Sequence, residues 1–273
     1  EFARCDIRHI LTRHEQSAAH MADGFGRVSR KPGVCFATSG PGATNILTGI
    51  ATAQADSSPM IAVTGQVPVA MIGKDAFQES DIIGMANPVV KYAFQPRLPE
   101  DVPEAVRKGF YIAETGRPGP VLIDVPKDVQ QNEAPMEFPE EFKIQGYHPW
   151  YDPDIVACEK AIDMLLNSEK PIILAGGGTI ISSAFAELQS IAETLMLPVV
   201  TTFKGKGAFP ENHPLSLGPI GMHGHAEANK MMAEADCVLA IGTRFSDRSV
   251  GTFEAFEKRL KIIHMDVDPA EIG

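Results

Sequence analysis

The sequence predicts an α/β protein made of two doubly wound, parallel-sheet domains, and three observations lead to that prediction. Short apolar runs alternate with helix-like stretches, the order expected of a parallel sheet with helices on both faces. An aperiodic, proline-rich segment interrupts this alternation once, near the middle. The chain has 273 residues, which suits two domains of ordinary size. We therefore expect a first domain at residues 1–130, a linker at 131–153 and a second domain at 154–273.

In the first half, the alternation starts with an extended stretch at 7–14 that leads into a helix beginning near Glu15. Small residues dominate this helix, and Ser39-Gly40-Pro41-Gly42 forms a later turn between a strand and a helix. The helix at 103–115 has apolar residues at spacings of three and four. The other expected elements are strands at 34–38, 60–64 and 121–125 and a helix at 43–55.

In the second half, the same alternation resumes after the linker. The helix at 155–167 places Ala157, Ala161 and Leu165 at spacings of four. The strand at 171–175 ends in three consecutive glycines. The other expected elements are strands at 198–203, 237–241 and 261–267 and helices at 184–195 and 226–235.

Charge and hydrophobicity exclude several classes of protein. The formal net charge is −11, so the chain lacks the excess of cations that binds nucleic acid. The longest apolar run, Cys237–Ile241, is far shorter than the roughly 20 residues that cross a membrane as a helix. Net charge is −1 over residues 1–130 and −10 over 131–273, which supports two units with different surfaces.

Cysteine and histidine spacings indicate neither disulfides nor a metal site. The four cysteines are scattered, so we expect reduced thiols and a cytoplasmic location: Cys5, Cys35, Cys158 and Cys237. The segment Gly221-Met222-His223-Gly224-His225 has an H-x-H pair but no further ligand at the usual spacing. We interpret it as a glycine loop lining a cavity.

Two glycine-containing turns in the second half are candidates for binding a phosphorylated cofactor. Gly176-Gly177-Gly178 follows a strand, where backbone N–H groups could bind an anion, but the third glycine of the dinucleotide fingerprint is missing. Taken alone, the triplet is more typical of a tight turn. Gly242-Thr243-Arg244 also follows a strand, with Asp247-Arg248 just beyond. Its arginines could neutralise a diphosphate or could pair with neighbouring carboxylates in solvent.

Glu15 is the candidate acid in the first half. It lies where a helix is expected to begin, so it could simply complement the helix dipole. Its small apolar neighbours could also bury it, which would raise its pKa and suit it to proton transfer. The spacing of residues leaves both interpretations open.

Several motifs together resemble the thiamine diphosphate enzymes, and acetolactate synthases in particular. The general resemblance lies in Arg13-His14-Glu15-Gln16, Ala22-Asp23-Gly24-Phe25 and Thr38–Asn45. More specific motifs are Thr64-Gly65-Gln66-Val67-Pro68, the stretch Ile72–Glu79 and the stretch Gly116–Asp128. The second half adds Gly221–Gly224 and Gly242–Arg248, so the resemblance covers essentially the whole chain.

The resemblance implies an enzyme that decarboxylates pyruvate and joins it to a second 2-keto acid, for branched-chain amino acid biosynthesis. Glu15 would hydrogen-bond the aminopyrimidine ring of thiamine diphosphate and Gln78 would lie near the reacting carbon. Gly40, Pro41 and Asn45 would pack against the same end of the cofactor. Pro68, Phe77 and Lys74 would line the substrate channel, where the family usually has threonine at position 74.

The resemblance also implies a structural FAD in the second domain and Mg²⁺ held by a third domain outside this sequence. The expected FAD-binding residues lie in the glycine turns and other strand ends: Gly176, Gly177, Gly178, Thr202, Phe203, Gly221, Met222, His223, Gly242, Thr243, Arg244, Asp247, Arg248, Asp266 and Val267. Pyruvate and 2-ketobutyrate would be the substrates. A homodimer or larger homo-oligomer with a regulatory small subunit is expected, without nucleic acid or membrane.

The sequence therefore resembles a fragment, which we expect to be inactive alone, with the start of its first domain also missing. Two alternatives stay open at this point. One is another thiamine diphosphate enzyme, such as a pyruvate oxidase or a catabolic acetolactate synthase without FAD. The other is a non-catalytic nucleotide-binding scaffold.

Overall fold

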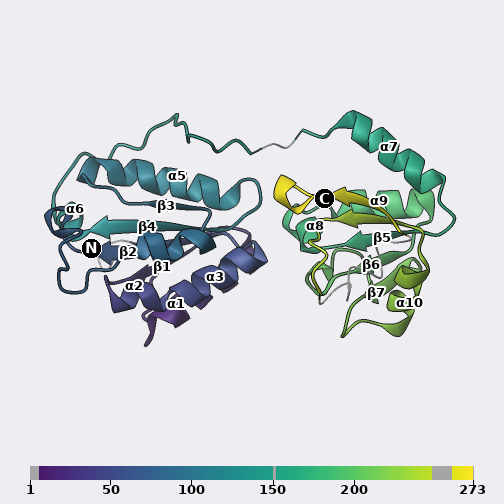
Figure 1. Cartoon of the computed structure of the whole chain (residues 1–273), viewed down its shortest axis with the longest axis horizontal. Helices are drawn as coiled ribbons and strands as arrows, with labels where there is room; N and C mark the ends of the chain where they lie inside the picture. Colours follow the sequence, from purple (N-terminus) through teal and green to yellow (C-terminus); the bar gives the residue numbers. More distant parts are fainter. Residues whose placement is uncertain (1–5, 150–151, 248–259, 273) are drawn as a thin grey trace. The chain divides into compact units, whose positions relative to one another are not determined.

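The computed structural model describes residues 6–149, 152–247 and 260–272. The chain divides into two compact units, Glu1–Pro149 and Trp150–Gly273. Each unit contains one parallel sheet with helices, so the predicted fold class is confirmed. Figure 1 shows both units.

The first unit has a four-stranded sheet in the order β1-β2-β4-β3, and all its strand pairs are parallel. Its strands are β1 (Gly33–Ala37), β2 (Met60–Gln66), β3 (Tyr92–Phe94) and β4 (Pro120–Pro126). Its helices are α1 (Glu15–Ser29), α2 (Pro41–Asn45), α3 (Leu47–Asp56), α4 (Ile82–Ala86), α5 (Val102–Glu114) and α6 (Lys127–Gln131). Short 3₁₀ turns occur at Val69–Met71, Asn87–Val89 and Pro99–Asp101.

Side chains of the central strands β2 and β4 are mostly buried on both faces, because helices cover both faces of this sheet. Along β4, Leu122 packs in the core beneath α1 and α3, whereas Val121 and Ile123 pack in the core beneath α5. Figure 1 shows α5 on one side of the sheet and α1 to α3 on the other. Burial on both faces explains why this strand reads as a continuous apolar run.

The second unit has a five-stranded parallel sheet in the order β7-β6-β5-β8-β9. Its strands are β5 (Pro171–Ala175), β6 (Val199–Thr201), β7 (Ser216–Pro219), β8 (Cys237–Ile241) and β9 (Lys261–Met265). Its helices are α7 (Ile155–Leu166), α8 (Gly177–Ile181), α9 (Phe185–Leu195) and α10 (Ala226–Glu234), with 3₁₀ turns at Phe203–Gly205 and Pro269–Glu271. On β5, Ile173 packs with α9, and Ile172 and Leu174 pack with α10.

Four local expectations are corrected by the structure. The helix expected at 43–55 is two helices, α2 and α3, separated at Ile46. Strands β3 and β7 were not anticipated. Residues 7–14 form no strand in the described part of the chain, although α1 does begin at Glu15. Two expected strands are shorter, because β6 ends at Thr201 and β9 at Met265.

The segment expected to be a linker is attached to the first unit over part of its length. Phe142 and Tyr147 pack against the core beneath α5, where Ile144 is buried. The Lys91 ammonium group donates hydrogen bonds to the Tyr147 hydroxyl at 3.0 Å, to the Thr115 carbonyl at 2.7 Å and to the Ile112 carbonyl. It thereby joins this segment to the C-terminal end of α5.

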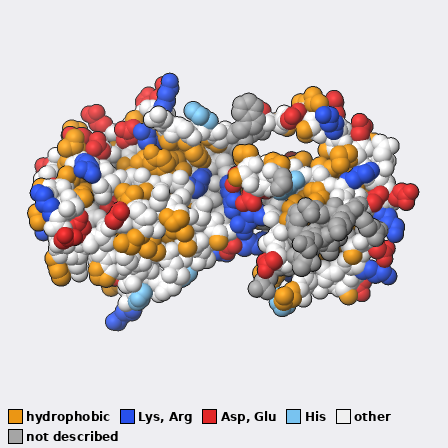
Figure 2. Space-filling view, in the orientation of Figure 1, with side chains coloured by type: hydrophobic (Ala, Val, Ile, Leu, Met, Phe, Trp, Pro, Cys, Tyr) orange, Lys and Arg blue, Asp and Glu red, His pale blue; other side chains and the backbone are white. Residues whose placement is uncertain are grey.

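The surface of the first unit exposes several large apolar side chains. Met21, Phe25 and Val28 lie on α1, and Val34 and Phe36 on β1, all more than two-fifths exposed. Figure 2 shows hydrophobic side chains interspersed with charged ones across the visible face of this unit. Among the described helices, none combines the length and the hydrophobicity that crossing a membrane requires.

Candidate functional site

The first candidate site lies at the carboxyl edge of the first sheet, where α1 begins. His14 precedes α1, and its Nδ1 accepts a hydrogen bond from the Gln16 backbone N–H at 3.1 Å. Glu15 is therefore the first helical residue, with its carboxyl group half-buried. Gly49 lets α1 and α3 approach closely, since a Cβ there would lie 2.4 Å from the Ala19 Cβ.

Glu15 and Asn45, 30 residues apart in sequence, are joined directly. The Asn45 amide donates a hydrogen bond from Nδ2 to Glu15 Oε2 at 3.1 Å. A Cβ on Gly42 would lie 3.5 Å from Glu15 Oε1 and 2.7 Å from the Thr38 Cγ2. Gly42 therefore packs closely against Thr38, and its lack of a Cβ leaves no side-chain atom of its own beside Glu15 Oε1.

The electrostatics of Glu15 differ from the expectation that burial raises its pKa. A hydrogen bond from its own backbone N–H, and then the one from Asn45, hold the pKa of Glu15 below its ordinary value. Because the carboxyl group is only half-buried, desolvation does not outweigh these hydrogen bonds. The expected upward shift is therefore wrong for this chain, and Glu15 is ionised at neutral pH.

Gly40 brings a second predicted residue, Gln78, to the same edge. Gly40 has φ +63° and precedes α2. A Cβ on Gly40 would lie 2.8 Å from the Gln78 carbonyl oxygen and 3.0 Å from its Cα. The two backbones therefore touch, and only glycine permits this approach. The structure thus places Gly40, Gln78, Asn45 and Glu15 around the turn that follows β1.

The remaining first-unit candidates lie on the segment at 67–81, between β2 and α4. Phe77 is 90% exposed, and Lys74 is exposed as well. Pro68 begins the segment and precedes the 3₁₀ turn Val69–Met71. None of these three has a hydrogen bond or ion pair with Glu15 among the described residues. Their predicted place along a substrate channel stays a prediction.

Two acidic residues to which the sequence analysis gave no role accept hydrogen bonds in this part of the first unit. Asp124 is fully buried on β4 and accepts hydrogen bonds from the Thr64 hydroxyl at 2.6 Å, Gln66 Nε2 at 3.1 Å and Gln95 Nε2 at 2.9 Å. Burial raises its pKa above the ordinary value. Glu79 accepts hydrogen bonds from backbone N–H groups of its own loop. A lone acid within a buried apolar strand is the sequence signal for Asp124.

The candidate FAD residues all follow the carboxyl ends of strands in the second sheet. Gly176 follows β5, Thr202 follows β6, Gly221 comes soon after β7, Gly242 follows β8 and Asp266 follows β9. In a doubly wound sheet, ligands bind outside these strand ends, at the point where the strand order reverses. Here that point lies between β5 and β8.

Glycines at this point serve close packing between backbones. A Cβ on Gly176 would lie 2.1 Å from the Gly242 carbonyl oxygen, and one on Gly178 would lie 2.6 Å from the Gly242 Cα. The Gly176 N–H donates to the Ile241 carbonyl at 2.8 Å, and the Gly178 N–H to the Gly242 carbonyl at 3.0 Å. Two of the three N–H groups of the glycine triplet are therefore used within the protein.

The other candidates in this unit differ in exposure. Phe203 and Met222 are 80% and 70% exposed. Thr202 and Thr243 are buried, and Thr202 Oγ1 accepts a hydrogen bond from the Gly205 N–H at 3.0 Å. The side chains of the candidates at four further positions are exposed: His223, Arg244, Asp247 and Val267. Arg248 lies outside the described residues.

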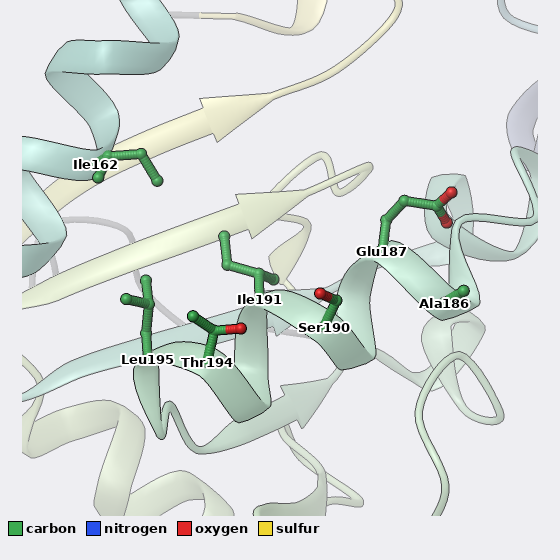
Figure 3. A pocket seen from close by; sticks show the side chains of 7 residues that line it. All are labelled: Ile162, Ala186, Glu187, Ser190, Ile191, Thr194 and Leu195. Atoms are coloured by element: carbon green, nitrogen blue, oxygen red, sulfur yellow. The ribbon is translucent and has the colours of Figure 1, made fainter.

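A shallow hollow of about 540 Å³ lies elsewhere on the second unit, between α7 and α9. Figure 3 shows its lining, from Ile162 on α7 and from successive turns of α9. None of the predicted site residues lines it. Within the described residues, no group of three or more His, Cys, Asp or Glu side chains could hold a metal ion. The described cysteines Cys35, Cys158 and Cys237 are free thiols.

Comparison with known proteins identifies the class to which these two units belong. Residues 1–85 match the family "Thiamine pyrophosphate enzyme, N-terminal TPP binding domain", and residues 158–273 match "Thiamine pyrophosphate enzyme, central domain". The chain therefore belongs to the thiamine pyrophosphate enzymes and contains their first two domains.

Within this class, the chain is similar to acetolactate synthase large subunits. It is 56% identical over 271 residues to "Probable acetolactate synthase large subunit" of Methanocaldococcus jannaschii, covering 98% of this chain and 46% of that protein. It is 51% identical to "Acetolactate synthase large subunit" of Cyanidium caldarium, with 98% and 46% covered. It is 47% identical to the Corynebacterium glutamicum large subunit, with 100% and 44% covered. The chain thus spans a little under half the length of these relatives.

Proposed function

We propose that this chain is part of the catalytic subunit of an acetolactate synthase. The reaction would decarboxylate pyruvate and join the remaining two-carbon unit to pyruvate or 2-ketobutyrate, in the synthesis of branched-chain amino acids. One observation is central to the proposal: the Glu15 carboxylate is held by Asn45 beside Gly42, next to the contact between Gly40 and Gln78. Relatives that match nearly the whole chain are named acetolactate synthase, which supports this choice over an oxidase or a non-catalytic scaffold.

The pyrimidine ring of thiamine diphosphate would lie beside Glu15 and Gly42, where the absence of a Cβ keeps side-chain atoms away from Glu15 Oε1. When bound, the cofactor supplies the acidic carbon on which decarboxylation and carbon–carbon bond formation take place. Glu15 would share a proton with a nitrogen of the pyrimidine ring through Oε1. Asn45 orients the carboxylate by its hydrogen bond to Oε2. Gly40 and Pro41 would form the wall against that ring.

The residues on segment 67–81 would act on the substrate. Gln78 would donate a hydrogen bond near the reacting carbon, since its backbone lies against Gly40 at the cofactor edge. Phe77, Pro68 and Lys74 would line the path by which 2-keto acids enter. An exposed lysine beside this path would attract the carboxylate of a keto acid.

The second unit is proposed to bind FAD at the carboxyl edge of its sheet. Exposed Phe203 and Met222 offer apolar surface for a flat ring, and Arg244 offers a cation for the diphosphate. Two N–H groups of the glycine triplet already donate hydrogen bonds within the protein. The triplet would therefore let FAD approach the backbone closely and would offer one remaining donor, the Gly177 N–H. FAD would have a structural role. Mg²⁺ is included as a further cofactor, without assignment to residues of this chain.

The proposal extends to the assembly. The enzyme would be a homodimer or larger homo-oligomer in the cytoplasm, with a regulatory small subunit as partner. The name "large subunit" of its relatives supports the existence of such a second subunit.

The test is Glu15→Gln in the full-length enzyme, assayed for acetolactate formation from pyruvate. Glutamine keeps the size of the side chain but cannot take up a proton, so activity should fall by roughly 100-fold or more. Glu187→Gln is the matched control, because Glu187 also lies in the first turn of a helix, α9, and has no assigned role. It should retain wild-type activity.

The outcomes separate the hypotheses. Equal activity of wild type and Glu15→Gln would remove the catalytic assignment. Full-length wild-type enzyme that forms no acetolactate would contradict the proposed function. Reduction of bound flavin by pyruvate would instead indicate an oxidase.

A further inference from the structure

The segment that bears Gln78 has backbone conformations that are unusual for residues other than glycine. Gly73, Asp75 and Gln78 all have positive φ, at 79°, 54° and 60°. Asp75 and Gln78 therefore adopt a left-handed conformation that L-residues seldom adopt without outside support. The segment from 72 to 79 has neither strand nor helix in the structure. Its shape therefore depends on isolated turn hydrogen bonds, such as the one from the Lys74 N–H to the Met71 carbonyl at 3.1 Å, and on side-chain contacts.

Glu79 provides the most direct of these contacts. Its two carboxylate oxygens accept hydrogen bonds from two different backbone N–H groups, Oε1 from Gly73 and Oε2 from Ala76 at 2.9 Å. Its own N–H donates to the Ala76 carbonyl at 2.9 Å. Both ends of the residue are thus bonded within the loop, and these hydrogen bonds lower the pKa of Glu79. The loop is closed around one ionised carboxylate.

A second contact fixes the loop where it leaves Glu79. The Gln66 side chain donates from Nε2 to the Ser80 carbonyl at 2.8 Å, and its Oε1 accepts from the Val67 N–H at 2.9 Å. Gln66 therefore ties the end of the loop to β2. Gln78 lies between this anchor and the part of the loop held by Glu79, with its backbone against Gly40.

We propose that Glu79 is a positioning residue: by accepting the N–H groups of Gly73 and Ala76, it holds the loop in the conformation that presents Gln78 at the cofactor edge. This inference rests on the proposed function for its kinetic consequence. Its structural part, the order of the loop, does not depend on that function. Glu79 acts through Gln78 and contacts neither substrate nor cofactor.

Glu79→Gln is the informative substitution. Glutamine keeps the length of the side chain but replaces one acceptor oxygen by an NH₂ group, so one of the two backbone donors loses its partner. Asp236→Asn is the matched control in the second unit. The Asp236 carboxylate likewise accepts two backbone N–H groups, from Glu169 and Lys170, both at 2.8 Å.

The kinetic experiment is a double-mutant cycle in the full-length enzyme, with kcat/KM for acetolactate formation as the readout. Glu79→Gln should lower kcat/KM by roughly 10- to 100-fold, since small misplacements of a reacting group have effects of this size. Gln78→Ala should lower it by at least as much. The double variant should lie within about twofold of Gln78→Ala, because Glu79 has no effect once Gln78 is gone. Asp236→Asn should retain wild-type kcat/KM.

Amide hydrogen exchange of the same proteins gives a readout independent of activity. Exchange at 73–76 should be faster in Glu79→Gln than in wild type and unchanged in Asp236→Asn. Unchanged exchange in Glu79→Gln would overturn the proposal, as would multiplicative losses in the double variant. If the wild-type enzyme formed no acetolactate, the proposed function would fail, and the exchange data would still decide whether Glu79 orders the loop.

Discussion

Replacing Asp124 by alanine and by asparagine should affect the stability of the first unit very differently. Asp124 is fully buried in β4, and its carboxylate accepts hydrogen bonds from Thr64, Gln66 and Gln95. All three donors are uncharged groups. The carboxylate therefore satisfies two buried donors and one half-buried donor, while its own burial opposes the charge.

The expected magnitudes follow from these contacts. Alanine leaves the Thr64 and Gln95 donors without their acceptor, whereas Gln66 keeps the Ser80 carbonyl. Each unsatisfied buried donor costs about 1–3 kcal/mol, so Asp124→Ala should destabilise the unit by about 3 kcal/mol. Asparagine still offers one oxygen to the side-chain amides of Gln66 and Gln95. Its NH₂ group can donate to the Thr64 hydroxyl once that hydroxyl rotates. Without a buried charge, Asp124→Asn should lie within about 1 kcal/mol of wild type.

The effect of pH has a defined sign. Burial raises the pKa of Asp124 in the folded state, so the folded chain binds this proton more readily than the unfolded chain. The wild type is therefore stabilised relative to Asp124→Asn as the pH falls from neutral through that raised pKa. The stability of Asp124→Asn relative to wild type should be highest at neutral pH and should decrease in acid.

Urea unfolding of the 273-residue chain, followed by near-ultraviolet circular dichroism of tyrosine, measures these differences. Three of the four tyrosines, Tyr92, Tyr111 and Tyr147, belong to the first unit. With an m-value of about 2 kcal/mol/M, Asp124→Ala should lower the midpoint by about 1.5 M. If asparagine lowered it as much as alanine, the negative charge itself would be stabilising, and the account of a buried charge opposed by desolvation would be refuted.

Two further contacts, one in each unit, can be tested by substitution. Gly176→Ala places a Cβ 2.1 Å from the Gly242 carbonyl oxygen and should destabilise the second unit by about 3 kcal/mol in urea unfolding. Gly177→Ala, whose nearest atom is 3.3 Å away, should cost less than about 1 kcal/mol, and equal effects would contradict the packing role. Lys91→Met removes the ammonium group that bonds Tyr147 and should cost about 2 kcal/mol. It should also speed chymotrypsin cleavage at Tyr147, and an unchanged rate would show that this segment is held by other contacts.

The two sheets could be predicted because their central strands are buried on both faces. Val121–Val125 and Cys237–Ile241 are almost wholly apolar, and both are confirmed as strands within β4 and β8. Strands β3 and β7 could not be predicted in this way. They are only three and four residues long, and their side chains are at most half-buried, so neither contains the longer apolar run that marks a buried strand.

Tertiary contacts decided the features that local sequence left open. Small-residue composition predicts one helix at 43–55, but the chain breaks it at Ile46, whose side chain is fully buried. The segment at 131–153 has the composition of a linker. Ile144 is nevertheless buried and Tyr147 is bonded to Lys91, because the core beneath α5 offers them apolar and polar partners.

The candidate site was predictable only in part. Position in a helix cannot distinguish Glu15 from Glu187, since both lie in a first turn. The family resemblance singled out Glu15, and the structure adds its bond to Asn45 and the downward direction of its pKa. The contact between Gly40 and Gln78 joins residues far apart in sequence, and no periodicity predicts it.

The acidic residues around the first site illustrate how loops at the carboxyl edge of a parallel sheet use carboxylates as acceptors for backbone N–H groups. A loop that leaves a strand loses the partners of its backbone N–H groups, and buried or half-buried donors need replacements. At this edge, the Glu79 carboxylate accepts hydrogen bonds from the N–H groups of Gly73 and Ala76, and the Asp128 carboxylate accepts one from the Val69 N–H. Asp75 and Gln78, in the loop that Glu79 closes, have left-handed conformations that a regular element would exclude. Motif residues next to a catalytic group are therefore to be tested first as acceptors for the backbone, and as acids or bases only when that role has been excluded.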